Sequence, residues 1–219
     1  MNDPTSQLIE RLAAEAQPVR RLRPPGLRAA LWLAAAGVVI ALAIWFFSDL
    51  PLVMRRMQSA RLDWEMAGML LAGVLAVIAA FELSLPDRSW LWCLLPLPPL
   101  GVWLASMGYN CYQHWFIDGW ALGSSWDCLL IIVAVSLPLG GTLFYLLHRA
   151  APLAPVRVAT VGGLAVGAIA AFTLQFFHPF EVTFMDLATQ IVAVGVVVLV
   201  TAGLERLRGA KPNRALLSF

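Results

Sequence analysis

The sequence predicts an all-α polytopic membrane protein with six transmembrane helices and both termini in the cytosol. Three observations lead to this fold class. The 219 residues are 60% hydrophobic and only 13% charged, whereas soluble domains are about half apolar and roughly a quarter charged. Six long apolar runs follow one another along the chain. Arginine and lysine gather in alternate segments between these runs, as they do in membrane proteins of fixed orientation.

The six apolar runs define the expected domain organisation. Each approaches or meets the about 20 residues that a hydrocarbon core of roughly 30 Å requires. A cytosolic arm over residues 1–28 precedes the transmembrane domain of residues 29–204, and a short basic tail over 205–219 follows it. The expected spans cover residues 29–47, 64–85, 90–107, 128–147, 156–177 and 184–204.

The third expected span differs from the others because three prolines fall in its middle. Pro96, Pro98 and Pro99 each lack the amide proton that a helix interior uses. Proline also bends a helix, and neighbouring helices can shield the freed backbone groups. We therefore expect a kink in this span.

The fifth expected span carries a stripe of small residues. Ala159, Gly163, Gly167 and Ala171 recur every four residues, and so lie on one helix face. Small side chains let another helix backbone approach closely in a membrane, where dispersion drives association. The stripe therefore predicts a close helix–helix contact, and Gly68 and Gly73 give weaker indications of one in the second span.

The placement of positive charge predicts the orientation. With a cytosolic N-terminus, the arm, the tail and two short loops lie inside. Only Arg55, Arg56 and Arg61 of the 15 lysine and arginine residues then lie outside. An excess of arginine and lysine marks the cytoplasmic side of a membrane protein. Both termini are therefore expected in the cytosol.

The sequence carries few signs of catalysis or transport. It has no phosphate-binding glycine-rich loop, no HExxH pair and no nucleophile elbow. Glu82 and Asp186 lie near span ends, whereas pumps and transporters place ionisable groups near the middle of the bilayer. We therefore expect no enzyme activity and no cofactor, and a transport pathway lacks support.

The predicted topology brings a cysteine and a histidine together on the outer surface. Cys128 begins the fourth span and His178 ends the fifth, and a short inner turn makes these spans neighbours. Thiolate and imidazole suit soft or borderline metal ions, so Cys128 and His178 are a candidate metal site and sensor. A simpler interpretation makes Cys128 a packed thiol and His178 a helix terminator. Cys111, in the preceding outer loop, could instead form a disulfide with Cys128, since both lie outside the reducing cytosol.

The arm combines a short amphipathic helix with a basic, proline-rich stretch. Three apolar residues share one edge of the helix over residues 6–17, and its polar face is almost neutral. A lipid-seeking helix would carry lysine and arginine on that face, so a protein groove fits better. As an alternative, Arg20, Arg21, Arg23 and Arg28 could serve only as a lipid-binding topology anchor. The residues expected to bind a partner are Leu8, Ile9, Leu12, Arg20, Arg21, Arg23, Pro24 and Pro25.

Several segments of the chain resemble the NrsF family of membrane anti-sigma factors. The arginine–proline stretch of residues 18–25, preceded by residues 8–12, resembles the opening of that family. The likeness continues through residues 119–128 before the fourth span, 151–153 in the inner turn, and 178–179 before the sixth span.

Membership would imply a regulatory protein of the bacterial inner membrane. The arm would hold an extracytoplasmic-function sigma factor away from core RNA polymerase, with no direct contact to nucleic acid. An envelope signal, such as a heavy metal or oxidative stress, would release the sigma factor. Family members resemble one another in carrying outer cysteines at the positions that match Cys128 and His178. The histidine here rules out a disulfide between those two positions, and leaves a Cys–His metal site or pairing with Cys111 open.

Two other classes of protein remain as alternatives. A small multi-span transporter or channel, for a metal or a hydrophobic solute, would need a polar membrane interior that the sequence hardly provides. A structural assembly factor for a membrane complex is a weaker possibility. The partners expected for the regulatory protein are the sigma factor, the lipid bilayer and a metal ion as signal.

Overall fold

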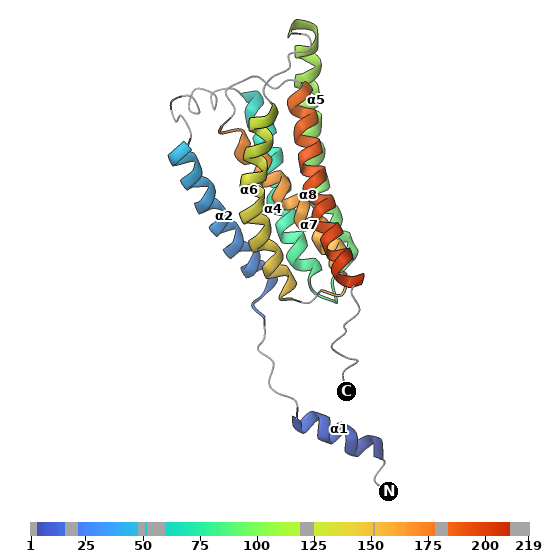
Figure 1. The fold of residues 1–219 in the computed structure, drawn as a ribbon. Coiled ribbons are helices and arrows are strands. Elements are labelled where there is room, and N and C mark those ends of the chain that lie inside the picture. Colours follow the sequence, from blue (N-terminus) through green and yellow to red (C-terminus); the bar gives the residue numbers. More distant parts are fainter. Residues whose placement is uncertain are drawn as a thin grey trace.

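The computed structural model describes residues 4–15, 22–47, 51, 60–118, 125–150, 152–177 and 184–210. Within these residues the chain forms seven α-helices, one short 3₁₀-helix and no strand, so the expected all-α class is confirmed. The helices α2 to α8 lie alongside one another in an elongated bundle (Figure 1). The elements are α1 (Pro4–Glu15), α2 (Pro25–Phe47), α4 (Ala60–Leu83), the 3₁₀-helix η1 (Trp90–Leu94), α5 (Leu97–Asp118), α6 (Ser125–His148), α7 (Pro155–Leu174) and α8 (Phe184–Ala210).

The centre of the bundle is α7, which packs against α4, α6 and α8. Fourteen of its 20 residues are buried, and most of these are alanine, glycine or valine. On the outside, α5 and α2 both pack against α4. The first turn of α2 and the last turns of α8 lie at the same end of the bundle, which we call the terminal end (Figure 1).

The stripe of small residues in α7 lies against α8, as close helix packing requires. A Cβ added at Gly163 would lie 3.0 Å from the backbone Cα of Val198, and one at Gly167 would lie 2.9 Å from a methyl of Val194. Any larger residue would therefore push the two helices apart. The prediction of a close helix–helix contact here is confirmed, with α8 as the partner.

The two glycines of the second expected span also mark close approaches. A Cβ added at Gly68 would lie 3.0 Å from the backbone nitrogen of Trp103 in α5. At Gly73 it would lie 2.7 Å from the side chain of Ile169 in α7. These glycines let α4 pack closely on two neighbours at once, which explains its place beside α7.

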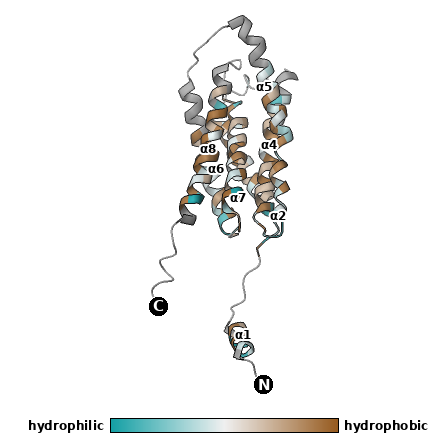
Figure 2. Ribbon diagram, turned by 90° about the vertical axis from the view of Figure 1, so that its right-hand side faces the viewer, coloured by the Kyte–Doolittle hydropathy of each residue, from teal (hydrophilic) through white to brown (hydrophobic). Residues whose placement is uncertain are grey.

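Among the described residues, five stretches are long and apolar enough to cross a membrane, so the chain is a multi-pass membrane protein. They are Pro25–Phe46, Trp64–Leu83, Trp90–Tyr109, Pro155–Leu174 and Gln190–Leu207. Apolar residues predominate along the helices between the two ends of the bundle (Figure 2), and many of the large ones are exposed. The fourth expected span falls on α6, where the apolar stretch with described side chains, Val133–His148, is shorter than the other five. That the fourth span crosses the membrane, and that the spans number six in all, stays a prediction.

The third expected span is matched by Trp90–Tyr109, but it consists of two helices in place of one kinked helix, so the predicted kink is wrong. The 3₁₀-helix η1 ends at Leu94, Pro96 lies in the turn after it, and α5 starts at Leu97. Pro98 and Pro99 thus occupy the first turn of α5, where the backbone amides have no partner within the helix and proline costs nothing. The prolines mark the start of a helix rather than a bend inside one.

The terminal end carries most of the described charge. Arg88 forms an ion pair with Glu82, with 2.9 Å between Nε and Oε2, which accounts for the acid near the end of α4. Glu65, in contrast, is only 1% exposed near the opposite end of the same helix. Glu65 lies inside the expected span 64–85, one residue after its start.

Candidate partner-binding arm and its link to the bundle

The first half of the arm is the helix α1, whose apolar edge is exposed. Leu8, Ile9 and Leu12 are 57%, 62% and 60% exposed, so no described part of the chain covers them. Positions 8 and 12 lie one helical turn apart and position 9 lies beside them, which makes a single apolar edge. Figure 2 shows α1 outside the bundle, beyond its terminal end. The structure thus contains the predicted amphipathic helix with its apolar edge uncovered.

The second half of the arm leads directly into the membrane. Leu22, Arg23 and Pro24 are exposed and belong to no helix. The Pro24 carbonyl accepts a hydrogen bond from the Arg28 amide at 3.1 Å, and Pro25 is the first residue of α2. Proline suits this position because its fixed φ angle matches the helix and its missing amide is not needed there. The helix therefore starts four residues before the expected span boundary at residue 29.

Other parts of the predicted arm are not described. Arg20 and Arg21 lie outside the described residues, so their role stays a prediction. Arg23 is the one member of the predicted arginine group whose side chain is described, and it is exposed. An exposed guanidinium keeps its full set of donors for a carboxylate on another molecule.

Arg28, which the sequence grouped with the membrane-anchoring arginines, has a different role. Its side chain is buried, and its guanidinium donates a hydrogen bond to the Leu146 carbonyl. That carbonyl belongs to the last turn of α6, where helix carbonyls lack partners within the helix and carry partial negative charge. The guanidinium also lies 4.9 Å from the centre of the Phe81 ring in α4. Arg28 thus caps α6 from a neighbouring helix and holds α2, α4 and α6 together.

A second contact links α2 to α6 one turn further along. The indole nitrogen of Trp32 donates a hydrogen bond to the Thr142 hydroxyl at 3.1 Å. That hydroxyl lies 3.0 Å from the carbonyls of both Pro138 and Leu139, so it can donate in turn to the backbone of α6, as threonine hydroxyls within helices do. The helix that continues the arm is therefore fastened to α6 at two successive turns. Sequence reasoning missed this link, although Arg28 and Trp32 are spaced four residues apart.

The candidate sensing residues lie largely outside the described part of the chain. The backbones of Cys111, near the end of α5, and Cys128, in the first turns of α6, are described, but their side chains are not. His178 lies outside the described residues altogether. The metal site and the disulfide therefore stay predictions. Cys93, in η1, packs against the core as a partly buried free thiol.

The comparisons with known proteins point to a single family. The family model named NrsF, negative regulator of sigma F, matches residues 12–208. The match covers the bundle and the arginine–proline stretch, and begins at the last apolar residue of the α1 edge, Leu12. No curated protein and no solved structure matches the chain significantly.

Proposed function

The chain belongs to the NrsF family of negative regulators of sigma F, and on this basis we propose that it is an inner-membrane anti-sigma factor. In this proposal the arm holds an extracytoplasmic-function sigma factor at the cytosolic face, where both termini lie. The family makes the chain a regulatory protein rather than an enzyme. The observation that carries the role of the arm is the exposed apolar edge of α1.

The energetics of the arm favour a binding surface made of two parts. Burying Leu8, Ile9 and Leu12 in a groove would contribute roughly 5–9 kcal/mol, at about 1.5–3 kcal/mol per side chain. Association itself costs an estimated 4–15 kcal/mol, so this edge alone gives weak binding. Arginines of the arm that meet acidic residues on the sigma factor would add affinity and speed the encounter. We therefore infer that the helix and the arginine stretch bind together.

The first experiment tests the apolar edge. Transcript profiling after deletion of the chain identifies the sigma factor through the set of genes that becomes active. That sigma factor is then co-purified with the wild-type chain and with the double variant Leu8→Asp and Leu12→Asp. We expect recovery to fall at least tenfold, because two carboxylates would have to enter an apolar groove, at a cost well above about 1.4 kcal/mol.

The control for this experiment places the same charges on the opposite face of α1. Gln7 and Ala14 are exposed and lie on the side away from the apolar edge. The double variant Gln7→Asp and Ala14→Asp should therefore co-purify the sigma factor as the wild type does. Equal recovery with both double variants would refute the role of the apolar edge.

We further propose that an envelope signal acts at Cys128, together with His178 or Cys111, and that α6 carries the change to the arm. Support comes from the course of α6, which contains Cys128 near one end and is fastened to α2 at the other by Arg28 and Trp32. Pro138 interrupts the hydrogen bonding within α6 between these points. A shift of α6 would then move the first turn of α2, from which the arm emerges.

The sensing proposal is tested with a reporter gene driven by the released sigma factor. Cells are exposed to cadmium or to hydrogen peroxide, as probes of metal and oxidative signals. We expect Cys128→Ser to stay repressed under the active probe while still co-purifying the sigma factor. If His178→Ala loses the response and Cys111→Ser keeps it, the sensor is a metal site. If Cys111→Ser loses the response and His178→Ala keeps it, the sensor is a disulfide. A Cys128→Ser chain that responds fully would disprove a sensing role for this thiol.

A further inference from the structure

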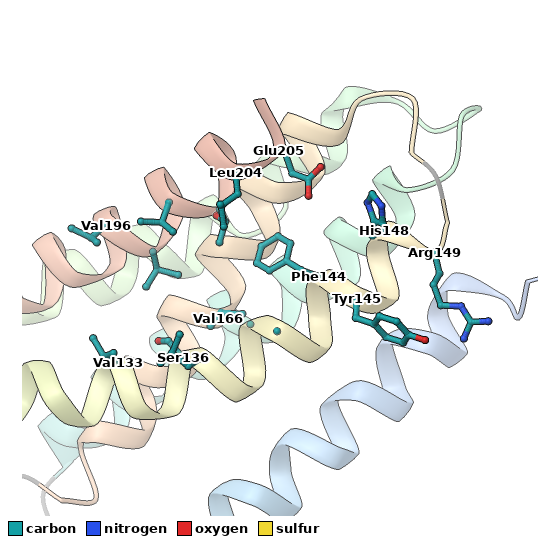
Figure 3. Close-up of a pocket in the computed structure, with 16 residues that line it drawn as sticks. Val133, Ser136, Phe144, Tyr145, His148, Arg149, Val166, Val196, Leu204 and Glu205 are labelled. Carbon is teal, nitrogen blue, oxygen red and sulfur yellow. The ribbon is translucent and has the colours of Figure 1, made fainter. Parts of the chain in front are cut away.

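A groove runs along the bundle between α6 and α8, with α7 as its floor. Both helices pack on α7 but make little contact with each other. Gly140 and Gly141 remove side chains from the facing surface of α6, and a Cβ at Gly141 would meet nothing within 4 Å. The resulting cavity has a volume of about 590 Å³. Figure 3 shows it lying between the two helices, with Val133 and Val196 towards one end and Glu205 and His148 towards the other.

The lining of the groove changes from apolar to charged along its length. Leu137, Phe144, Val200 and Leu204 make most of its walls apolar. Three of these, Leu137, Val200 and Leu204, are more than half exposed, so the groove opens towards the surrounding bilayer. At the terminal end the lining finishes with three titratable side chains, His148, Arg149 and Glu205. The groove thus has the polarity of a phospholipid: hydrocarbon along its length and charge at the membrane surface.

The length of the groove fits a hydrocarbon chain. From Val133 to His148 it extends over about 22 Å, at about 1.5 Å per residue. One leaflet of hydrocarbon is about 15 Å deep, so an acyl chain that starts at the surface can fill the groove beyond the bilayer midplane.

We propose that this groove binds one acyl chain of a phospholipid from the leaflet at the terminal end, with its phosphate at His148 and Arg149. Lipid tails gain no hydrophobic energy by leaving the bilayer for the groove. The acyl chain is held because the side chains on both walls of an unfilled groove would lose dispersion contacts. The guanidinium, 5.7 Å from the centre of the Tyr145 ring, adds charge-assisted hydrogen bonds to the phosphate. The carboxylate of Glu205 at the same end disfavours a second negative charge, which favours a zwitterionic headgroup such as phosphatidylethanolamine.

The test is photo-crosslinking in vesicles of phosphatidylethanolamine and phosphatidylglycerol. Trace phosphatidylethanolamine with a diazirine in one acyl chain is the probe, and labelled residues are mapped by mass spectrometry. We expect labels on both walls, within residues 133–145 of α6 and 196–204 of α8. Gly141→Phe should reduce this labelling about tenfold, because the added ring fills the groove without meeting the backbone. Gly37→Phe, at a glycine of α2 that is equally open, should leave it unchanged.

A second comparison tests the role of the phosphate. A diazirine-labelled diacylglycerol, which lacks the phosphate, should label the groove several-fold less than the phospholipid does. Arg149→Gln should bring the two probes to the same level. Three results would overturn the proposal. Gly141→Phe could leave the labelling unchanged, the labels could spread evenly over lipid-facing residues such as Val38, or both probes could label the groove to the same extent. Crosslinks between α6 and α8 of two copies would also overturn it, and would assign the groove to a dimer.

Discussion

The contact between α7 and α8 allows a quantitative prediction, because only glycine fits at Gly163. In Gly163→Ala the new methyl would lie 3.0 Å from the Val198 Cα and would also meet the Thr201 side chain. Backbone cannot rotate away as a flexible side chain can, so the two helices must separate by several tenths of an ångström. The same separation weakens the hydrogen bond from the Thr201 hydroxyl to the Ala159 carbonyl, which is already 3.3 Å long.

The cost follows from the dispersion contacts that are stretched. We take the stretched contact around Gly163 as equal to that of one buried leucine side chain, about 50 atom pairs at about 0.15 kcal/mol each. A gap of about 0.5 Å forfeits roughly a quarter of this attraction, which is about 2 kcal/mol. In water, alanine would recover about 0.5–1 kcal/mol through its helix propensity. In a membrane the separated helices stay helical, so that gain is largely absent. We therefore expect Gly163→Ala to lower the free energy of unfolding by about 2 kcal/mol.

The measurement is unfolding of the purified protein in mixed micelles by increasing SDS, followed by tryptophan fluorescence. Gly141→Ala is the matched control, since its new methyl points into open space and should change the free energy of unfolding by less than about 0.5 kcal/mol. If Gly163→Ala and Gly141→Ala unfold at the same SDS fraction, α7 and α8 do not approach as closely as described. The reasoning from the small-residue stripe would then fail.

Four further substitutions test the link between α2 and α6 and the role of Cys93, the free thiol of η1. Arg28→Met removes the donor to the Leu146 carbonyl, and should cost about 1.5–3 kcal/mol in the same SDS titration; Arg28→Lys, which keeps a charged donor, should cost less. Trp32→Phe loses the hydrogen bond to Thr142 and should cost about 1 kcal/mol; a cost near zero would show that this bond adds no stability. Cys93→Ala should leave the cadmium and peroxide responses of the reporter unchanged, and an altered response would show that this thiol takes part in sensing.

The sequence predicted best the features that depend on composition and local spacing. Apolar length located the spans, and four-residue spacing found the stripe at Gly163. The partner of that stripe could not be predicted, because spacing identifies a helix face but not the neighbour that covers it. The prolines at 98 and 99 were misjudged for a related reason. Apolar residues before them hid the helix start, so the run appeared to be one continuous helix.

The candidate sites were harder to predict, because the sequence does not tell whether a charged residue is exposed or buried. Arg28 follows Arg20, Arg21 and Arg23 in the sequence and seemed to share their role. In the structure it is one helical turn inside the membrane segment, where it caps another helix. Glu65 was overlooked on similar grounds, because sequence position alone did not reveal that this side chain would be buried in the bundle.

The position of α6 connects the observations on the arm with those on the groove. One side of its last turns is fastened to α2 through Arg28 and Trp32, and the other side borders the groove between α6 and α8. A displacement of these turns towards α8 would narrow the groove and also pull on the start of α2. Under both proposals, lipid in the groove would oppose that displacement and hold the arm in one arrangement. Lipid occupancy and sigma-factor release would then be coupled, so Gly141→Phe would change the signal threshold of the reporter without touching the arm.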